Sequence, residues 1–169
     1  MASFHFVSAI LKHNKQAFAK NEISEENGET PTETILKPIL GCEFNVCEDH
    51  LDKKRKDNGY QIVLLAKTKK GYHNLAKMSS IAFINGFYYV PRIDRKIIEQ
   101  YKEDVIVLTG NTYGEVPNKI LNVGEKQAEE ALIWWKQQFG DDLYIELMRH
   151  NQEDERIVNE TLLKFAKNH

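Results

Sequence analysis

The stretch DVIVLTGN, residues 104–111, decides the fold expected of this chain. It is a short apolar run that ends at a glycine, which is typical of a buried strand. Helical patterns follow over residues 112–140, and another strand is expected over 141–150, DDLYIELMRH. Strands that alternate with helices at this spacing form βα units. The second half of the chain therefore predicts a parallel α/β arrangement.

The preceding part of the sequence predicts a long hairpin over residues 36–68. Phe44 and Val46 are expected to be buried in its first strand, together with Ile39. The hairpin contains a charged loop that closes on Asn58-Gly59, a strong turn signal. Helices are expected over 69–86 and from about residue 94 onward, because apolar residues recur there at helical spacing. This part of the chain adds strands and surrounding helices to the same α/β domain.

The N-terminal 40 residues have a different character. Residues 3–19 read as an amphipathic helix. The stretch KNEISEENGETPTET, residues 20–34, is acidic and contains Gly28 and Pro31, so it offers no apolar face to a core. We expect a flexible insertion over 20–34 within one partial domain that spans residues 1–169.

Composition narrows the function classes. The chain has 169 residues, a usual length for one domain, and a formal net charge of -2, which argues against electrostatic binding of nucleic acid by the chain alone. Cys42 and Cys47 are its two cysteines, too few for a disulfide framework or a zinc ribbon. The N-terminus is too polar for a membrane span or a secretory signal. These features predict a cytoplasmic protein without a membrane partner.

Functional side chains of parallel α/β folds sit at the carboxyl ends of strands. That rule selects Glu43, Asn111 and His150, whose carboxylate, amide and imidazole would suit a divalent metal. The alternatives are plain. A strand-end histidine is more often a surface or capping residue, and Asn111 after a glycine is most simply a turn residue. Glu43, if buried without metal, needs a partner such as Arg149.

Other polar positions carry weaker signals. His50 lies in the charged loop, and we expect it to face solvent. Of the adjacent pair Trp134 and Trp135, one is expected in the core and the other at a helix edge. The sequence contains no phosphate-loop, dinucleotide-binding or catalytic-serine motif. The residues alone therefore predict a soluble α/β domain with a polar cluster at its strand ends.

Several stretches together resemble one family, the N-terminal PHP (polymerase and histidinol phosphatase) domain of bacterial DNA polymerase III alpha subunits. The resemblance covers nearly the whole chain in the family's order, and it rests on PILGCEFNVCEDH, NGYQIVLLAKTKKGYHNLAKMSS, GFYYVPRID, VIVLTGNTYGEVP and QFGDDLYIELMRHNQEDE. It implies a partial distorted β/α barrel of the PHP, TIM-like type, with several strands, surrounding helices and sheet edges left open by truncation.

The resemblance also assigns site residues. Glu43 matches the family's glutamate ligand, His150 matches the histidine of its R-H motif, and Asn111 stands where the family often has a cysteine or histidine. The family's opening H-x-H strand, its T-D-H motif and its closing D-x-H strand are absent from these residues. We therefore expect Glu43, His150 and, weakly, Asn111 to be remnants of an incomplete metal centre.

The function implied is that of a fragment of the replicative alpha subunit, a DNA-directed DNA polymerase and nucleotidyltransferase that uses magnesium. The fragment alone would be an inactive scaffold without a cofactor, in contact with the rest of the polymerase chain and replisome subunits, and with DNA only through its parent. The alternative is a PHP-type metal-dependent phosphoesterase or 3'-5' exonuclease that uses zinc or manganese. An interaction module unrelated to replication would require the ordered motifs to be accidental. Open sheet edges predict that the fragment self-associates.

Overall fold

The computed structural model describes residues 2–169, with side chains described from Phe6 onward. The chain divides into two compact units, of which the first extends to Leu40 and the second covers Gly41–His169. Each unit has its own secondary structure, so we describe them in turn.

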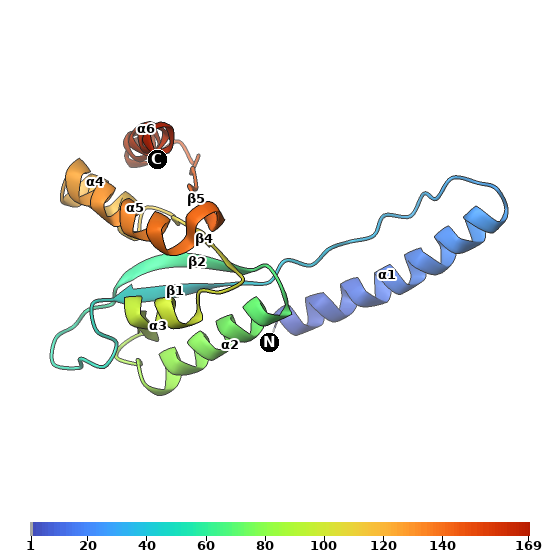
Figure 1. Cartoon of the computed structure of the whole chain (residues 1–169), viewed down its shortest axis with the longest axis horizontal. Coiled ribbons are helices and arrows are strands. Elements are labelled where there is room, and N and C mark those ends of the chain that lie inside the picture. The colour runs from blue at the N-terminus through green and yellow to red at the C-terminus, as the bar shows by residue number, and fades with distance from the viewer. Residues whose placement is uncertain (1) are drawn as a thin grey trace. The chain divides into compact units, whose positions relative to one another are not determined.

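The first unit is a helix and the segment that returns along it. Helix α1 spans Ala2–Glu26, so it is longer than the predicted helix over 3–19 and includes part of the stretch 20–34. The following residues run back beside it without regular secondary structure (Figure 1). The Asn14 side chain bonds the Leu36 N–H and C=O at 2.9 and 2.7 Å, and the Asn21 side chain bonds those of Glu33 at 3.0 and 2.9 Å. Flexibility of the stretch 20–34 stays a prediction.

The second unit is built on a five-stranded mixed sheet in the order β3-β1-β2-β4-β5. Its strands are β1 (Gly41–Cys47), β2 (Tyr60–Ala66), β3 (Arg92–Asp94), β4 (Val105–Leu108) and β5 (Leu143–Tyr144). The β1–β2 and β2–β4 pairs are antiparallel, which confirms the hairpin, while β1–β3 and β4–β5 are parallel. The sheet does not close into a barrel, so β3 and β5 are its edges, in keeping with a partial PHP-like α/β fold.

Helices connect these strands at the positions expected from the sequence (Figure 1). Thr68 caps the first of them, because its hydroxyl accepts hydrogen bonds from the backbone N–H groups of Lys70 and Gly71. A 3-10 turn at Gly140–Asp142 ends the long helix, where Gly140 has a φ of 54°. The helices are α2 (Lys69–Ile84), α3 (Arg95–Tyr101), α4 (Glu115–Asn122), α5 (Glu125–Phe139) and α6 (Glu153–Asn168).

The core lies on one face of the sheet. Phe44 and its cross-strand partner Ile62 point to this face and are 4% and 2% exposed. Side chains alternate between faces along a strand, so Val46 and Leu64 join them. Helices supply the rest of the cluster, chiefly Leu75, Met78, Ala82, Ile98, Leu132, Trp135 and Phe165. Trp135 is buried and Trp134 is half-buried against the same cluster, which confirms the prediction for this pair.

On the opposite face, the paired residues of β2, β4 and β5, together with Glu43 and Asn45 of β1, are exposed or half-buried, whereas Cys47, Arg92 and Asp94 are buried at the β3 edge. Cross-strand partners there include Glu43 with Val63 and Leu65 with Ile106. We call this surface the open sheet face and define it by Glu43, Asn45, Gln61, Val63, Leu65, Ile106, Leu108 and Tyr144. Five of these eight residues are apolar or aromatic, so the face is unlike an ordinary solvated surface.

Two expectations for the strands are wrong. Ile39 is 69% exposed and precedes β1 instead of packing in it. The last strand is only two residues long, although 141–150 reads as one continuous strand. The reason is local: the backbone of Met148 bonds the side chain of Asn159 on α6 through both its N–H and its C=O, at 3.3 and 2.8 Å. The chain leaves the sheet to follow α6.

No helix in the part of the chain that the structure describes is long and apolar enough to cross a membrane.

Candidate metal centre

Glu43 lies in the middle of β1, on the open sheet face, opposite Val63. Its side chain is exposed, so the condition under which Glu43 would need a buried partner does not arise. The alternation along β1 explains this, because Phe44 and Val46 occupy the buried face and Glu43 must take the other. Within the described residues, Glu43 makes no ion pair with Arg149, which is itself exposed.

His150 sits at the start of α6. Its Nδ1 lies 2.7 Å from Oε1 of Glu155, and its backbone N–H donates to Oε2 of the same carboxylate. These hydrogen bonds, the backbone one first, hold the pKa of Glu155 below its ordinary value. The ring is 65% exposed. His150 is therefore a surface residue just before α6, in keeping with the surface alternative.

Asn111 follows Gly110 at the end of β4. Its Oδ1 accepts the Tyr113 N–H at 2.8 Å, which closes a tight turn, and its Nδ2 donates to Oε1 of Gln61 at 3.3 Å. This is the turn role that the alternative reading gives it. Each of the three predicted ligands is thus engaged locally or faces solvent, and the structure gathers no metal site from them.

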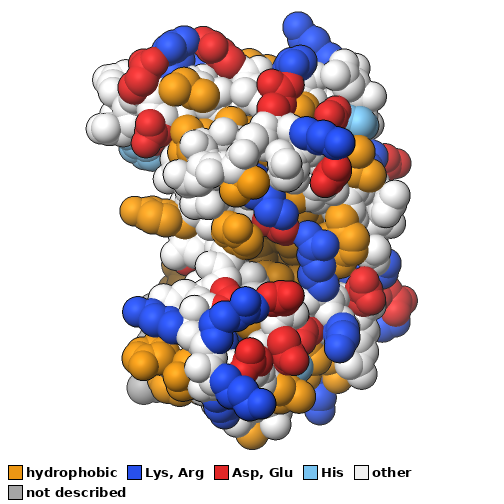
Figure 2. All heavy atoms as spheres, turned by 90° about the vertical axis from the view of Figure 1, so that its left-hand side faces the viewer, with side chains coloured by type: hydrophobic (Ala, Val, Ile, Leu, Met, Phe, Trp, Pro, Cys, Tyr) orange, Lys and Arg blue, Asp and Glu red, His pale blue; other side chains and the backbone are white. Residues whose placement is uncertain are grey.

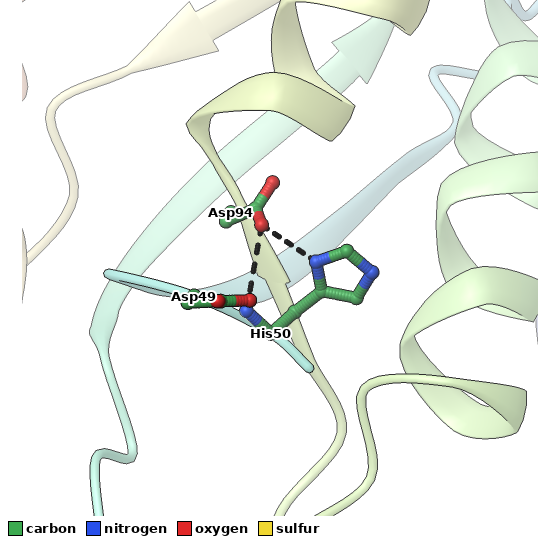
Figure 3. A group of neighbouring side chains, drawn as sticks. All are labelled: Asp49, His50 and Asp94. Carbon is green, nitrogen blue, oxygen red and sulfur yellow. Dashed lines mark hydrogen bonds and ion pairs between the residues drawn. The ribbon is translucent and has the colours of Figure 1, made fainter. Parts of the chain in front are cut away.

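A different group of potential ligands lies beside β3. Among the side chains that the structure describes, Asp49, His50 and Asp94 alone form a set of three or more with ligand atoms within 4.8 Å of one another (Figure 3). Asp94 ends β3, while Asp49 and His50 follow β1 in the charged loop. His50 is only 8% exposed, so the prediction that it faces solvent is wrong.

Hydrogen bonds within the protein already occupy these atoms. Asp94 accepts the Ile97 N–H through Oδ1, which caps α3, and contacts Nδ1 of His50 through Oδ2 at 2.6 Å. Asp49 accepts the Leu51 N–H through Oδ1 at 2.9 Å. Figure 3 shows the second ring nitrogen of His50 pointing away from both carboxylates. A cation would have to displace these bonds, so the donor set fits a loop anchor better than a metal.

The charge on Asp94 is stabilised by this arrangement. Burial acts to raise the pKa of Asp94, but the hydrogen bonds from His50 and from the Ile97 backbone outweigh it. Its pKa therefore lies below the ordinary value of 3.8. A carboxylate that stays deprotonated and caps a helix stabilises the local fold.

Arg92, two residues before Asp94 on β3, completes the anchor. Its guanidinium is fully buried and donates to backbone carbonyls of Gly86, His50, Asp52 and Asp57. Sequence reasoning missed this network. An aspartate directly before a predicted helix was the available signal for Asp94, whereas nothing local in the sequence predicts which carbonyls the Arg92 side chain reaches.

Comparison with known proteins places this geometry in context. A family model described as the PHP domain matches residues 4–150. Curated relatives named DNA polymerase III subunit alpha include that of Borreliella burgdorferi, 39% identical over 136 residues, and that of Aquifex aeolicus, 39% identical over 142 residues. Both alignments cover 78% of this chain and 12% of the relative. The relative from Chlamydia muridarum is 34% identical over 90% of this chain and 13% of its own length. The chain spans about an eighth of the length of these relatives.

Proposed function

The chain belongs to the PHP domain family, and from this premise we propose that it acts as a non-catalytic scaffold within a replicative DNA polymerase alpha subunit. It is homologous to the N-terminal region of DNA polymerase III alpha subunits. Primer extension, its magnesium and DNA itself belong in this proposal to the longer protein. A cytoplasmic location is part of the same proposal.

The observation that carries the proposal is that the three predicted ligands do not converge on one point. Glu43 faces solvent, Asn111 closes a turn and His150 bonds Glu155. A catalytic metal site needs several ligands that converge on one point and leave one position open. The PHP domain is a metal-binding family, and this chain has one His/Asp group of suitable composition, Asp49, His50 and Asp94. Stoichiometric zinc or manganese is not expected there, because the group's hydrogen bonds are internal.

The second candidate is a metal-dependent phosphoesterase or 3'-5' exonuclease of the PHP type. The observation in its favour is the same group of Asp49, His50 and Asp94, whose atoms lie close enough to share a cation. Its weakness is that the carboxylate of Asp94 is committed to His50 and to the start of α3.

Hydrolysis assays separate the two candidates. The chain would be incubated with a chromogenic phosphomonoester and with end-labelled single-stranded DNA, in the presence of zinc or manganese. We expect no turnover above that of the variants Glu43→Ala/His150→Ala and Asp49→Asn, with Glu48→Ala as an exposed-carboxylate control. Metal-dependent hydrolysis that is lost in either site variant and kept in the control would establish the phosphoesterase instead.

The partners follow from the shape of the sheet. β3 and β5 are edges, and the open sheet face presents the half-exposed apolar side chains of Val63, Leu65 and Ile106. Surfaces of this kind are covered in stable folds. We propose that other parts of the polymerase chain cover them in the complete subunit, that replisome subunits are reached through it, and that the isolated chain covers them by self-association.

A further inference from the structure

A second feature of the molecule, whose lining includes none of the three predicted ligands, is a pocket of about 710 Å³. That volume lies within the range of small-molecule sites. It opens on the face shown in Figure 2, where lysine and arginine side chains gather around a hollow. The charged loop forms one wall and the starts of α3 and α4 form the other. We call it the Arg95 pocket, lined by Tyr60, Arg95, Glu115, Lys119, Arg55 and Lys56, among others.

Glu115 is the buried centre of this pocket. Its Oε1 accepts hydrogen bonds from Arg95 and Lys119, both at 2.7 Å, and its Oε2 accepts from Nε1 of Trp135 at 3.0 Å. Burial acts to raise the pKa of Glu115, but the bonds and charges of Lys119 and Arg95 outweigh it and lower the pKa. The carboxylate is therefore ionised at neutral pH, and it fixes the two cations in place.

Two cations share one carboxylate, so the cluster has a surplus positive charge. Arg95 donates to Glu115 through one terminal nitrogen. Among the described residues, its Nε and its other terminal nitrogen have no hydrogen-bond partner. Lys119 likewise donates to Glu115 through one of the three N–H groups of its ammonium. The Arg95 guanidinium carbon lies 4.2 Å from the centroid of the Trp134 ring, and this cation–π contact helps to position the side chain. The N–H groups of Arg95 and Lys119 that do not bond Glu115 are therefore held at the pocket.

The loop wall brings two cations to the opening, Arg55 and Lys56, and two carboxylates, Glu48 and Asp57, so its net charge is zero. Arg55 and Lys56 come from the loop, whose course is fixed because Asp57 accepts the Glu48 and Gly59 backbone N–H groups. Arg55 pairs with Glu48, while Lys56 lies over the Tyr89 ring. The carboxylate of Asp57 is thereby occupied by the backbone, so it opposes an incoming anion less than a free carboxylate would.

The pocket has no activated nucleophile in its cysteine. Burial raises the pKa of the Cys47 thiol to about 11, so the thiol stays protonated at neutral pH. Its Sγ donates to the Ile93 carbonyl at 3.3 Å. The chemistry that remains is binding by fixed positive donors.

We infer that the Arg95 pocket binds a phosphate group, with Arg95 and Lys119 as its direct ligands and Glu115 as the positioning residue between them. A guanidinium and an ammonium with unspent donors suit the oxygens of a phosphate dianion. The shared chemistry is that of orthophosphate and of a phosphomonoester such as a nucleoside monophosphate. This site is independent of the scaffold proposal and of any metal.

Calorimetric titration with orthophosphate and, separately, with a nucleoside monophosphate tests the inference. We expect one phosphate group to bind per chain. Arg95→Gln and Lys119→Gln should each raise the dissociation constant at least about tenfold. Lys164→Gln is the matched control, because Lys164 forms an exposed ion pair with Glu125 on another part of the surface. Tighter binding of the nucleotide would assign the phosphate to a nucleotide, and equal binding would assign it to the free anion.

Lys119→Gln keeps the bond between Arg95 and Glu115, so it tests binding even where Arg95→Gln lowers stability. Thermal unfolding of each variant verifies that the fold is retained. Absence of heat with both ligands at millimolar concentration in the wild type would overturn the inference. So would titrations of a folded Lys119→Gln protein and a folded Arg95→Gln protein that match the control.

Discussion

Arg92 shows how one side chain organises its surroundings. Its guanidinium is fully buried, and four backbone carbonyls, three of them in the charged loop, accept its hydrogen bonds. A buried cation is costly unless every donor is satisfied, and here backbone oxygens take the place of a carboxylate. The residue thus ties the loop after β1 to β3 and to the end of α2.

Replacing Arg92 by methionine should therefore destabilise the fold strongly. Arg92→Met keeps much of the side-chain volume but leaves buried carbonyls without donors, so we expect a loss of about 3 kcal/mol in the free energy of unfolding. Arg156→Met on exposed α6 should change it by less than about 0.5 kcal/mol. Urea unfolding measures both. Equal stabilities would mean that the loop is not anchored through Arg92.

The pair of His50 and Asp94 gives a pH-dependent contribution. The pKa of Asp94 is lower in the folded chain than in the unfolded chain, so its contribution to stability is present above the unfolded pKa and is lost as pH falls through the folded one. Asp94→Asn should be less stable than the wild type at pH 7, and the difference should shrink below about pH 4. Unfolding curves between neutral and acid pH test this. Asp141→Asn, an exposed position, is the control, and a pH-independent difference at Asp94 would contradict the assignment.

The site could be predicted from sequence only where local rules decide it. Asn111 closes a turn and His150 lies at the surface, as the alternative readings have it, because both depend on near neighbours. The burial of His50 could not be read, because it depends on contacts with Asp94 and Arg92, more than 40 residues away. Contacts between residues so far apart cannot be predicted from the local spacing of residue types.

At the scale of elements, helix α2 shows how close packing overrides propensity. Gly71 lies in its first turn, where a side-chain Cβ would come within 2.0 Å of the Asp104 carbonyl oxygen. Alanine normally stabilises a helix relative to glycine. Here the backbone before β4 approaches too closely for any side chain.

Gly71→Ala should consequently destabilise the protein despite its better helix propensity. We expect a loss of about 1–3 kcal/mol, the usual cost of overpacking. Ser80→Ala, at an exposed position of the same helix, should be neutral or slightly stabilising. Thermal unfolding of the two variants decides the point, and a stabilised Gly71→Ala protein would show that α2 and the chain before β4 pack more loosely than described.

Elements with strong local signals were predictable and weakly paired ones were not. The hairpin of β1 and β2 and the helices α2 and α5 follow from apolar periodicity, turn residues and caps. The strand expected at 141–150 shrinks to β5 because Asn159 takes the backbone bonds that continued pairing would use. An apolar alternation indicates a strand, but it does not guarantee a partner strand of equal length.

The whole molecule is defined by a sheet that is covered on one face. The core packs against Phe44, Ile62 and Leu64, while the open sheet face and the edge β5 stay partly exposed. The other edge, β3, is covered, because its three residues are buried. The open α/β sheet agrees with the partial barrel that the resemblance implies. We propose that the exposed apolar residues of this face favour association of the isolated chain.

Self-association should therefore depend on the open sheet face. We expect sedimentation velocity to show oligomers whose fraction rises with concentration. The double variant Leu65→Lys/Ile106→Lys should shift the population toward monomer, whereas Lys53→Ser/Lys54→Ser in the exposed loop should not. A wild-type chain that stays monomeric at high micromolar concentration would contradict the account of this surface.

We propose that this PHP domain serves as a scaffold and holds no complete metal centre. The most direct test is the metal content of the chain after purification without chelator, measured beside Glu43→Ala/His150→Ala and Asp49→Asn variants. The account predicts far less than one zinc or manganese per chain in all three proteins. One bound metal per wild-type chain, lost in either variant, would contradict it and establish a working PHP centre.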